Sequence, residues 1–386
     1  MAGVIVARDG AIVTRSAEEA AEAAGEDLRT PAGFLRWLGD GAYTAARVDL
    51  DPEESKAAIP FWDQHVARLA ESLRLLAVSV GASTPSASCS DVVRAIDPSV
   101  RAALTALTFP SGGAPRSVSA MLTVALVPPR GACVIHALPM DRAPPPPPAV
   151  LFLSPHRRAN PRAKAVRWAR DRRPLEATLH TFSGGKDVPR PTEVLMTTPG
   201  GDALEGLKCN FFAVFRQPQQ QKQPVKGTAQ GTGLGEGEAS VGLGDGTAPM
   251  ADAIEVRTAS VDAGVLPGIA RAAALEALRG MGLPVVEAEE GVAMDAIMGG
   301  GGEASSCVEA FTTSGVRMVQ PVRAIVTADG RPVILPPFLT RGEGEGVREP
   351  REGAAAMGPV TARVCEAVSR LARDRARSWV VRASAF

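Results

Sequence analysis

The chain has 386 residues, with 42 Lys and Arg against 42 Asp and Glu, so its formal net charge is zero. This balance argues against a polyanionic partner such as nucleic acid, and no run is apolar for long enough to predict a membrane span. The first residues, MAGVIVARDGAIV, lack the layout of a secretory signal. The length is sufficient for two globular domains with sizeable cores.

Cysteine and histidine are few and scattered along the chain. The cysteines are odd in number and form no CxxC motif: Cys89, Cys133, Cys209, Cys307 and Cys365. This pattern favours a reducing, intracellular compartment, without deciding between the cytoplasm and an organelle such as the plastid. The four histidines do not cluster either, so the sequence predicts no metal site.

The N-terminal part has the pattern of mixed α/β structure. Two apolar runs around Asp9-Gly10 predict a β-hairpin. Apolar residues at helical spacing predict a helix within residues 61–80, and a second helix follows at 89–96. MLTVALVPP and ACVIHALP then have the composition of strands.

The proline run APPPPPA cannot join a helix or a central strand and predicts a stiff, extended connector. We therefore expect an N-terminal α/β domain at 1–142, a connector at 143–148 and a C-terminal domain at 149–386. A rigid surface loop inside a single domain is the alternative.

In the C-terminal part, AVLFL, EVLMT, NFFAVF, IEVRTAS, VEAFTT and VILPPF are strand-like. LPGIARAAALEALRGMG predicts a helix that begins after Pro-Gly, and GPVTARVCEAVSRLARDRARSW predicts a final amphipathic helix. Residues 217–250 contain mostly Gln, Gly, Glu and Thr, which predicts a disordered insertion. The alternation of strands and helices favours an α/β or α+β fold with a cleft between two domains.

Four features suggest chemistry, although each has an ordinary structural explanation. Lys164 could be a solvated cation in an arginine-rich segment, and Glu205 an exposed turn residue. LPGIAR could be a simple helix start and TTSG a simple loop. Their order along the chain is more informative than any one of them.

In that order, five segments resemble the class IV aminotransferases, the pyridoxal-phosphate enzymes of fold type IV. The segments are AKAVRW, ALEGLKCNFFAVF, GVLPGIARAAALEALRGMGLPV, CVEAFTTSGVRMVQPVRAI and GPVTARV. The family includes branched-chain and D-amino-acid transaminases and aminodeoxychorismate lyase. Upstream, GAYTAARV and FWDQHVARLAESLRLL fit its N-terminal domain, and AYTAAR is similar to a plant-type subgroup of uncertain substrate. The resemblance implies a two-domain α/β (α+β) architecture, with pyridoxal 5′-phosphate at the domain interface of a homodimer.

The resemblance assigns the two catalytic residues. Lys164 matches the lysine that holds the cofactor as a Schiff base and shuttles a proton. Glu205 matches the carboxylate that pairs with the pyridine nitrogen, and Gly206 would let the backbone approach the ring. Nearby Arg162 or Arg167 would help to lower the pKa of the lysine.

The resemblance also assigns a phosphate site. Arg68 matches the family's phosphate arginine, with an exposed helix arginine as the alternative. The N–H groups of Ile269 and Ala270, which follow Gly268 at a helix start, would bind an anion.

This chain departs from the family pattern at two places. A Thr or Ser that contacts the phosphate in the family falls at Gly315, so the hydroxyl of the adjacent Ser314, or that of Thr313, is expected to substitute. Several members have Asn-Tyr after the lysine, where this chain has Arg167-Trp168.

Two aromatic residues are expected near the substrate. Trp168 can pack against the cofactor but cannot accept a hydrogen bond. Tyr43, the single tyrosine of the chain, maps to a segment that lines the substrate pocket in relatives. An ordinary buried aromatic is the alternative for Tyr43.

The sequence favours an aminotransferase that moves an amino group between an amino acid and a 2-oxo acid in a ping-pong cycle. A lyase of the same family, which releases pyruvate from an aminodeoxychorismate-like substrate, is one alternative. A non-catalytic descendant that binds the cofactor is another, suggested by the departures at Arg167-Trp168 and Gly315.

Overall fold

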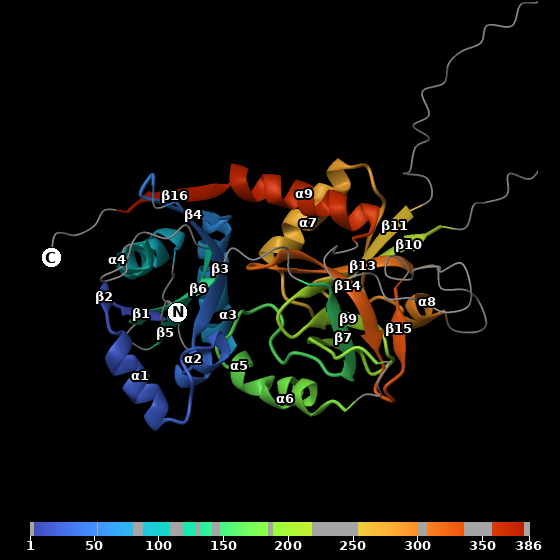
Figure 1. The fold of residues 1–386 in the computed structure, drawn as a ribbon, viewed down its shortest axis with the longest axis horizontal. Coiled ribbons are helices and arrows are strands. Elements are labelled where there is room, and N and C mark those ends of the chain that lie inside the picture. The colour runs from blue at the N-terminus through green and yellow to red at the C-terminus, as the bar shows by residue number, and fades with distance from the viewer. Residues whose placement is uncertain are drawn as a thin grey trace, which may run out of the picture.

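The computed structural model describes residues 4–51, 53–79, 88–108, 119–128, 132–140, 147–183, 188–217, 254–299, 307–335 and 357–381. Within these residues, two β-sheets lie side by side with helices packed against them (Figure 1). The predicted mixed α/β class is confirmed. Residues 218–250 of the expected insertion and 143–146 of the expected connector lie outside the described residues.

The first sheet is antiparallel and has the strand order β16-β4-β3-β5-β6-β1-β2. Its strands are β1 (Ile5–Arg8), β2 (Ala11–Ile12), β3 (Ala42–Asp51), β4 (Lys56–Pro60), β5 (Ser119–Val127), β6 (Ala132–Met140) and β16 (Ala376–Val380). The helices of this part are α1 (Thr14–Ala23), α2 (Pro31–Trp37), α3 (Trp62–Ser79) and α4 (Cys89–Thr108). The predicted hairpin is β1-β2, in which Asp9 and Gly10 have φ angles of 47° and 90°.

The second sheet closes on itself, because β9 pairs with both β8 and β10. The ring of strands runs β10-β13-β14-β7-β8-β9, and β11, β12 and β15 extend it. The strands are β7 (Ala149–Pro155), β8 (Glu193–Thr197), β9 (Ala203–Gly206), β10 (Asn210–Arg216), β11 (Ile254–Ala259), β12 (Val285–Ala288), β13 (Cys307–Ser314), β14 (Met318–Val326) and β15 (Pro332–Ile334). The helices of this part are α5 (Trp168–Asp171), α6 (Arg173–Thr181), α7 (Ile269–Gly280), α8 (Met294–Met298) and α9 (Pro359–Asp374).

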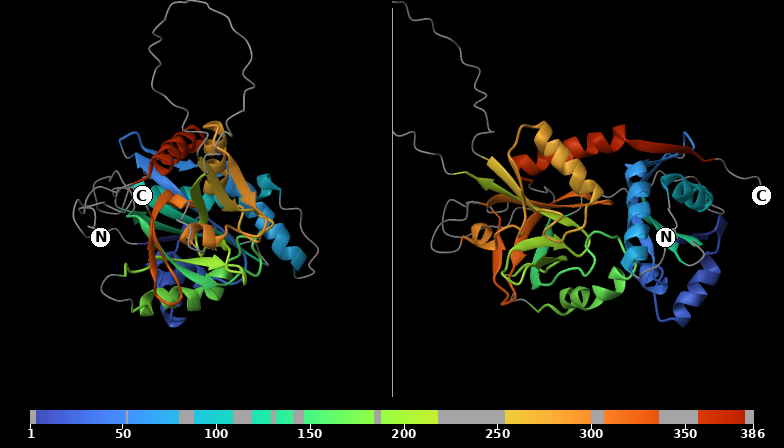
Figure 2. Two further views of the ribbon diagram at one scale, coloured as in Figure 1. Left: turned by 90° about the vertical axis from the view of Figure 1, so that its right-hand side faces the viewer. Right: turned by 180° about the vertical axis from the view of Figure 1, so that it is seen from behind.

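The C-terminal segment connects the two parts. Helix α9 packs with α7 in one apolar cluster, through residues such as Val364 and Leu278, and β16 then pairs with β4 of the first sheet. Figures 1 and 2 show this segment running along one side of the molecule. The division at 142/149 stays a prediction, and β16 joins the first sheet although its residues belong to the second range. None of the described helices is suited in length and apolarity to crossing a bilayer.

Strand β3 is the place where segments of the second part meet the first. The backbone N–H of Tyr43 donates to the carbonyl of Lys164 at 2.9 Å, and the N–H of Arg47 donates to the carbonyl of Gly315 at 3.2 Å. From helix α3, the hydroxyl of Ser72 accepts a hydrogen bond from the N–H of Lys164 at 3.0 Å. Helix α3 stands at the boundary between the two parts (Figure 2, right). These contacts fix the lysine segment and the β13–β14 turn against β3 and α3.

Candidate active site

Lys164 lies between β7 and α5, beside Tyr43 and within the electrostatic influence of three arginines. Its Nζ lies 4.8 Å from the centroid of the Tyr43 ring. Burial, together with the positive charges of Arg68, Arg158 and Arg172, lowers the pKa of Lys164 to about 8, and Tyr43 acts in the opposite direction. A lysine in this environment keeps a substantial fraction of neutral amine near neutral pH, as a nucleophile requires.

The expectation that Arg162 or Arg167 lowers the pKa of Lys164 is wrong. Arg162 is exposed and forms an ion pair with Asp262. Arg167 is also exposed and lies 3.6 Å from Asp171. The arginines that act on the lysine are the three named above, which come from α3 and from either end of the arginine-rich segment.

Lys208 lies at the edge of the cluster formed by Lys164 and these arginines, where it shares the carboxylate of Glu176 with Arg172. It is exposed and lies 3.5 Å from the carboxylate of Glu176. Of the two lysines nearest to the features that suggested chemistry, Lys164 is therefore the one with the environment of a nucleophile.

Glu205 lies buried in β9, where the ring of strands closes. Its Oε2 accepts hydrogen bonds from Asn210 Nδ2 at 3.1 Å and from the N–H of Leu266 at 3.0 Å. Its Oε1 lies 3.3 Å from Arg158 Nε, close enough for charge attraction, but the N–H is not directed at it and the oxygen accepts no hydrogen bond. Burial raises the pKa of Glu205, and Arg158 and the Leu266 N–H partly oppose this.

Gly206 is required by packing within the protein. A Cβ atom at this position would collide with Sγ of Cys209 and lie 3.2 Å from Cγ of Glu193. The close approach that we expected from the cofactor is therefore made by protein atoms.

Arg68 points into the protein from α3 and is not an exposed helix arginine. Its Nη2 donates to the Thr44 hydroxyl at 2.6 Å, and that hydroxyl lies 2.7 Å from Nδ1 of His65. Burial, Arg68 and Lys164 hold the pKa of His65 well below its usual value, so the ring is neutral and Nδ1 accepts the hydroxyl proton. Burial also lowers the pKa of Arg68 to about 10, and its Nε has no hydrogen-bond partner.

Helix α7 begins after Gly268, and no side chain caps its start. The free N–H groups of the first turn, at Ile269 and Ala270, thus stand at the positive end of the helix dipole. Gly268 has a φ of −73°, which any residue can adopt. Glycine is needed there for space, because a Cβ would collide with Oδ1 of Asn210.

In the TTSG segment, the hydroxyl without a partner belongs to Thr313, whereas Ser314 was the first choice from the sequence. Thr313 is buried and its Oγ1 has no hydrogen-bond partner. The hydroxyl of Ser314 accepts a hydrogen bond from the N–H of Arg317 at 3.2 Å. Gly315 has no side chain because its backbone docks on β3, where a Cβ would lie 2.7 Å from the carbonyl oxygen of Ala45.

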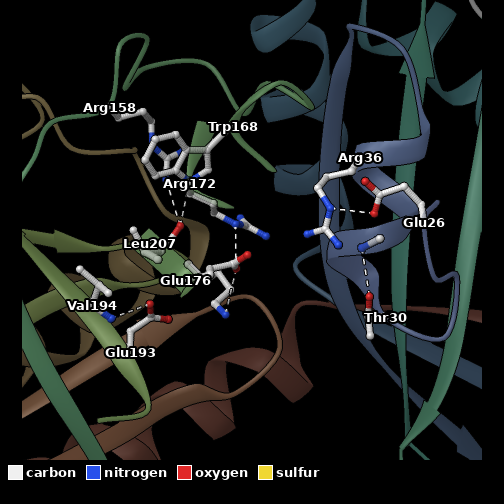
Figure 3. A network of polar contacts seen from close by, with 12 residues as sticks. Glu26, Thr30, Arg36, Arg158, Trp168, Arg172, Glu176, Glu193, Val194 and Leu207 are labelled. Atoms are coloured by element: carbon white, nitrogen blue, oxygen red, sulfur yellow. Dashed lines mark hydrogen bonds and ion pairs between the residues drawn. The ribbon is translucent and has the colours of Figure 1, made fainter. Parts of the chain in front are cut away.

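Trp168 packs against residues that neighbour Glu205. Its Nε1 donates to the carbonyl of Leu207 at 2.9 Å, and Cζ of Arg158 lies 4.5 Å from the ring centroid. Figure 3 shows Trp168 and Arg158 directed at the same carbonyl, beside the pair of Arg172 and Glu176. The structure thus places Trp168 against Arg158, the arginine nearest to Oε1 of Glu205. It places Tyr43 beside Lys164.

Sequence reasoning missed several residues that complete the site: Thr44, His65, Ser72, Arg158, Arg172 and Asn210. Arg158 and Arg172 were indistinguishable from the exposed arginines around them. Asn210 opens the strand NFFAVF, and its position beside a carboxylate five residues earlier was the one signal that could have found it.

Among the buried atoms without hydrogen bonds in the described residues, three have the chemistry that the expected cofactor, pyridoxal 5′-phosphate, requires. Lys164 provides an amine for an aldehyde, and Oε1 of Glu205 is a free acceptor for a ring N–H. Arg68 Nε and Thr313 Oγ1 are free donors suited to a phosphate. The residues present therefore fit this group.

Solved structures show the same fold. A putative branched-chain amino acid aminotransferase from Thermotoga maritima is 16% identical, with 96% of each chain covered and a TM-score of 0.54. A branched-chain aminotransferase from Thermoproteus uzoniensis with norvaline is 17% identical, with 96% of this chain and 95% of the other covered and a TM-score of 0.53. The PLP-bound form of a hypothetical aminotransferase from Mycobacterium tuberculosis is 14% identical, with 97% and 100% covered and a TM-score of 0.53.

No curated protein matches the chain significantly. The family model described as amino-transferase class IV matches residues 41–325, which is more than half of the chain. That range includes Tyr43, Arg68, Lys164, Glu205 and Thr313. The chain therefore belongs to the class IV aminotransferases, the family of fold type IV enzymes whose cofactor is pyridoxal 5′-phosphate.

Proposed function

We propose that the protein is an aminotransferase that moves an amino group between an amino acid and a 2-oxo acid in a ping-pong cycle, with Lys164 as the residue that binds the cofactor covalently. The observation that carries this proposal is the environment of Lys164. A sheltered amine with a pKa of about 8, which is acted on by the charges of three arginines and interacts with a buried carboxylate, is suited to nucleophilic and proton-transfer chemistry.

Lys164 has two roles in this proposal. Its neutral amine forms the covalent link, and during turnover it moves the proton at the substrate Cα. When bound, the cofactor supplies the aldehyde that receives the amino group and a ring that accepts electrons. The hydrogen bonds of the Lys164 backbone to Tyr43 and Ser72 hold the amine in one place.

Glu205 would hold the ring nitrogen of the bound cofactor in its protonated form. Asn210 and the Leu266 N–H orient the carboxylate through Oε2, which leaves Oε1 for the ring N–H. Arg158 favours the ionised form of Glu205, and a positively charged ring nitrogen would favour it further.

The phosphate end is formed by donors from three elements. Arg68 contributes its free Nε, the start of α7 contributes the N–H groups of Ile269 and Ala270 after Gly268, and the TTSG turn contributes a hydroxyl. Thr313 is the stronger candidate for that hydroxyl. Ser314 can still donate its proton, and Gly315 can contribute only backbone.

The proposal also includes the substrate side of the site and the assembly. Tyr43 lies beside Lys164 and would line the substrate pocket, whereas Trp168 would shape it indirectly through Arg158. We further propose a homodimer, by analogy with the family.

Absorption spectra of the two half-reactions test the function. A panel of amino acids should convert the lysine-linked form of the cofactor to the amino form, and a 2-oxo acid should restore it. Release of pyruvate from one substrate, without dependence on an oxo acid, would instead indicate the lyase. A protein that binds the cofactor and converts no substrate in the panel would contradict the proposal.

A further inference from the structure

Three polar side chains share one face of helix α3. His65, Arg68 and Ser72 follow one another at intervals of three and four residues, so they lie one above the other along the helix. His65 and Ser72 are each only 1% exposed. The Ser72 hydroxyl accepts the backbone N–H of Lys164 at 3.0 Å. This face of α3 therefore anchors the lysine segment and presents Arg68 one helical turn away.

Arg68 is a partly buried cation without an anionic partner. No Asp or Glu in the part of the chain that the structure describes forms an ion pair with it, and none is among the charged groups that act on its pKa. Its Nε is buried and has no hydrogen-bond partner. Withdrawing a charged group from water without a counter-charge costs free energy. An anion bound at Nε would reduce this cost, as the phosphate site proposed above requires.

Neutral groups hold the other end of the guanidinium. Nη2 of Arg68 donates to the Thr44 hydroxyl at 2.6 Å and lies 3.5 Å from Nδ1 of His65. The same hydroxyl lies 2.7 Å from Nδ1. Because a guanidinium nitrogen can only donate, the lone pair of Nδ1 faces Arg68 and Thr44. The hydrogen bonds thus run in one direction, from Arg68 through Thr44 to His65.

Rigid elements fix both acceptors. Thr44 is 1% exposed and lies within β3, where it pairs with Val124 of β5, and a β-branched side chain in a strand has few rotamers. The His65 ring packs close to the turn between β13 and β14, since a Cβ at Gly315 would lie 3.5 Å from its Cε1. A hydroxyl and an imidazole held in this way restrict the orientation of the guanidinium.

The neutrality of the acceptors has a consequence for binding. A carboxylate would also orient Arg68, but it would neutralise the charge that attracts a phosphate. We propose that Thr44 and His65 are positioning residues for Arg68, which orient its guanidinium toward the cofactor phosphate and leave its positive charge uncompensated. This inference rests on the phosphate site of the proposed function and adds two residues to it.

The affinity for pyridoxal 5′-phosphate divided by that for pyridoxal tests the inference. Both ligands carry the aldehyde, and only one carries the phosphate, so the ratio isolates the phosphate contacts. Thr44→Val keeps the shape of the side chain without the hydroxyl and should lower the ratio about tenfold. Thr44→Ser restores the hydroxyl and should keep the ratio within about threefold of the wild type. Absorbance titrations of the purified proteins measure both affinities.

The second acceptor and a control complete the test. His65→Leu should lower the ratio by a similar factor, and adding Thr44→Val should lower it little further, because both changes break the same chain of hydrogen bonds. Thr108→Val removes a buried hydroxyl that donates to the Leu104 carbonyl in α4 at 2.9 Å, and it should leave the ratio unchanged. A purely structural role of Thr44 would weaken the binding of both ligands equally, and a ratio unchanged by Thr44→Val would overturn the inference.

Arg68→Met separates this inference from the function on which it rests. It should lower the ratio about 100-fold, because the phosphate loses its cation. A loss in Arg68→Met without a loss in Thr44→Val would leave the phosphate site standing and refute only the positioning role. A ratio unchanged by Arg68→Met would overturn both. Binding needs no turnover, so a failure of transamination would leave these results readable.

Discussion

Two buried carboxylates in the closed ring of strands have different surroundings. Glu309 on β13 and Glu205 on β9 are 4% and 2% exposed. Glu309 accepts hydrogen bonds from the N–H groups of Val360 and Thr361 at 3.0 and 2.8 Å, and from the Thr361 hydroxyl at 2.7 Å. It thereby caps α9, and both of its oxygens are occupied. Oε1 of Glu205 accepts no hydrogen bond.

Burial therefore does not distinguish these two carboxylates, but hydrogen-bond satisfaction does. A buried acceptor without a donor costs free energy. Oε1 of Glu205 lacks a donor in a strand where the other carboxylate oxygen is well bonded, as expected of an atom that a ligand completes. The free atoms of Glu205, Arg68 and Thr313 have this property, and the carboxylate of Glu309 does not.

The largest expected difference between the two carboxylates is in turnover. Glu205→Gln should reduce kcat about 10²- to 10³-fold, because the ring nitrogen loses an anionic partner. Glu205→Ala should also leave β9 folded while sharply reducing kcat. Glu309→Gln should keep the kcat of the wild type per folded molecule. Steady-state kinetics on both variants check this, and equal losses would mean that the two sites are not functionally distinct.

For stability, the substitution of Glu309 should have a larger effect than that of Glu205. Glu309→Gln replaces one acceptor oxygen with an amide donor opposite donors of α9, which should lower the free energy of unfolding by about 1–3 kcal/mol. Glu205→Gln should lower it less, since an amide oxygen can still accept from Leu266 and Asn210. Denaturant unfolding of the cofactor-free proteins measures both values. A larger loss of unfolding free energy for Glu205→Gln than for Glu309→Gln would contradict the conclusion that Glu309 is the more completely hydrogen-bonded carboxylate.

The pH dependence of stability gives a smaller effect with a defined sign. Burial raises the pKa of Glu205 above its unfolded value of about 4.3. Its contribution is fully present below that value and is lost as pH rises through the folded pKa. The stability of the cofactor-free wild type relative to Glu205→Gln should therefore decrease across this window. Chemical unfolding at a series of pH values measures it, and a rising difference would show that Glu205 is ionised and stabilising.

The smallest effect is expected at Lys208, which follows Glu205 by three residues in the sequence. Lys208 forms a half-exposed ion pair with Glu176, and such pairs contribute about 0–1 kcal/mol. Lys208→Met should leave kcat unchanged and alter the free energy of unfolding by less than about 1 kcal/mol. A large loss of kcat would extend the site to this side of β9.

Local patterns predicted the elements that are defined locally. The Asp9-Gly10 hairpin, helix α7 and strand β10 follow from turn residues and periodicity within each segment. Strand β16 was not anticipated, because five residues at a helix end become a strand only by pairing with β4. Gly315 was read as a defect in a phosphate loop, but its contact with β3 depends on how the two parts meet.

The site was predicted in part for the same reason. Resemblance assigned Lys164 and Glu205 to positions that the structure brings into one buried charge network. It could not separate Arg158 and Arg172 from Arg162, because these arginines look alike in the sequence. In the folded chain Arg158 and Arg172 are buried, whereas Arg162 is exposed. Contacts between segments far apart in the sequence therefore determine which arginines belong to the site.

The visible absorption spectrum of the protein with added pyridoxal 5′-phosphate tests the central claim most directly. The wild type should develop the band of a lysine-linked cofactor, Lys208→Ala should develop the same band, and Lys164→Ala should lack it. A band that persists in Lys164→Ala, or that disappears in Lys208→Ala, would contradict the assignment of Lys164.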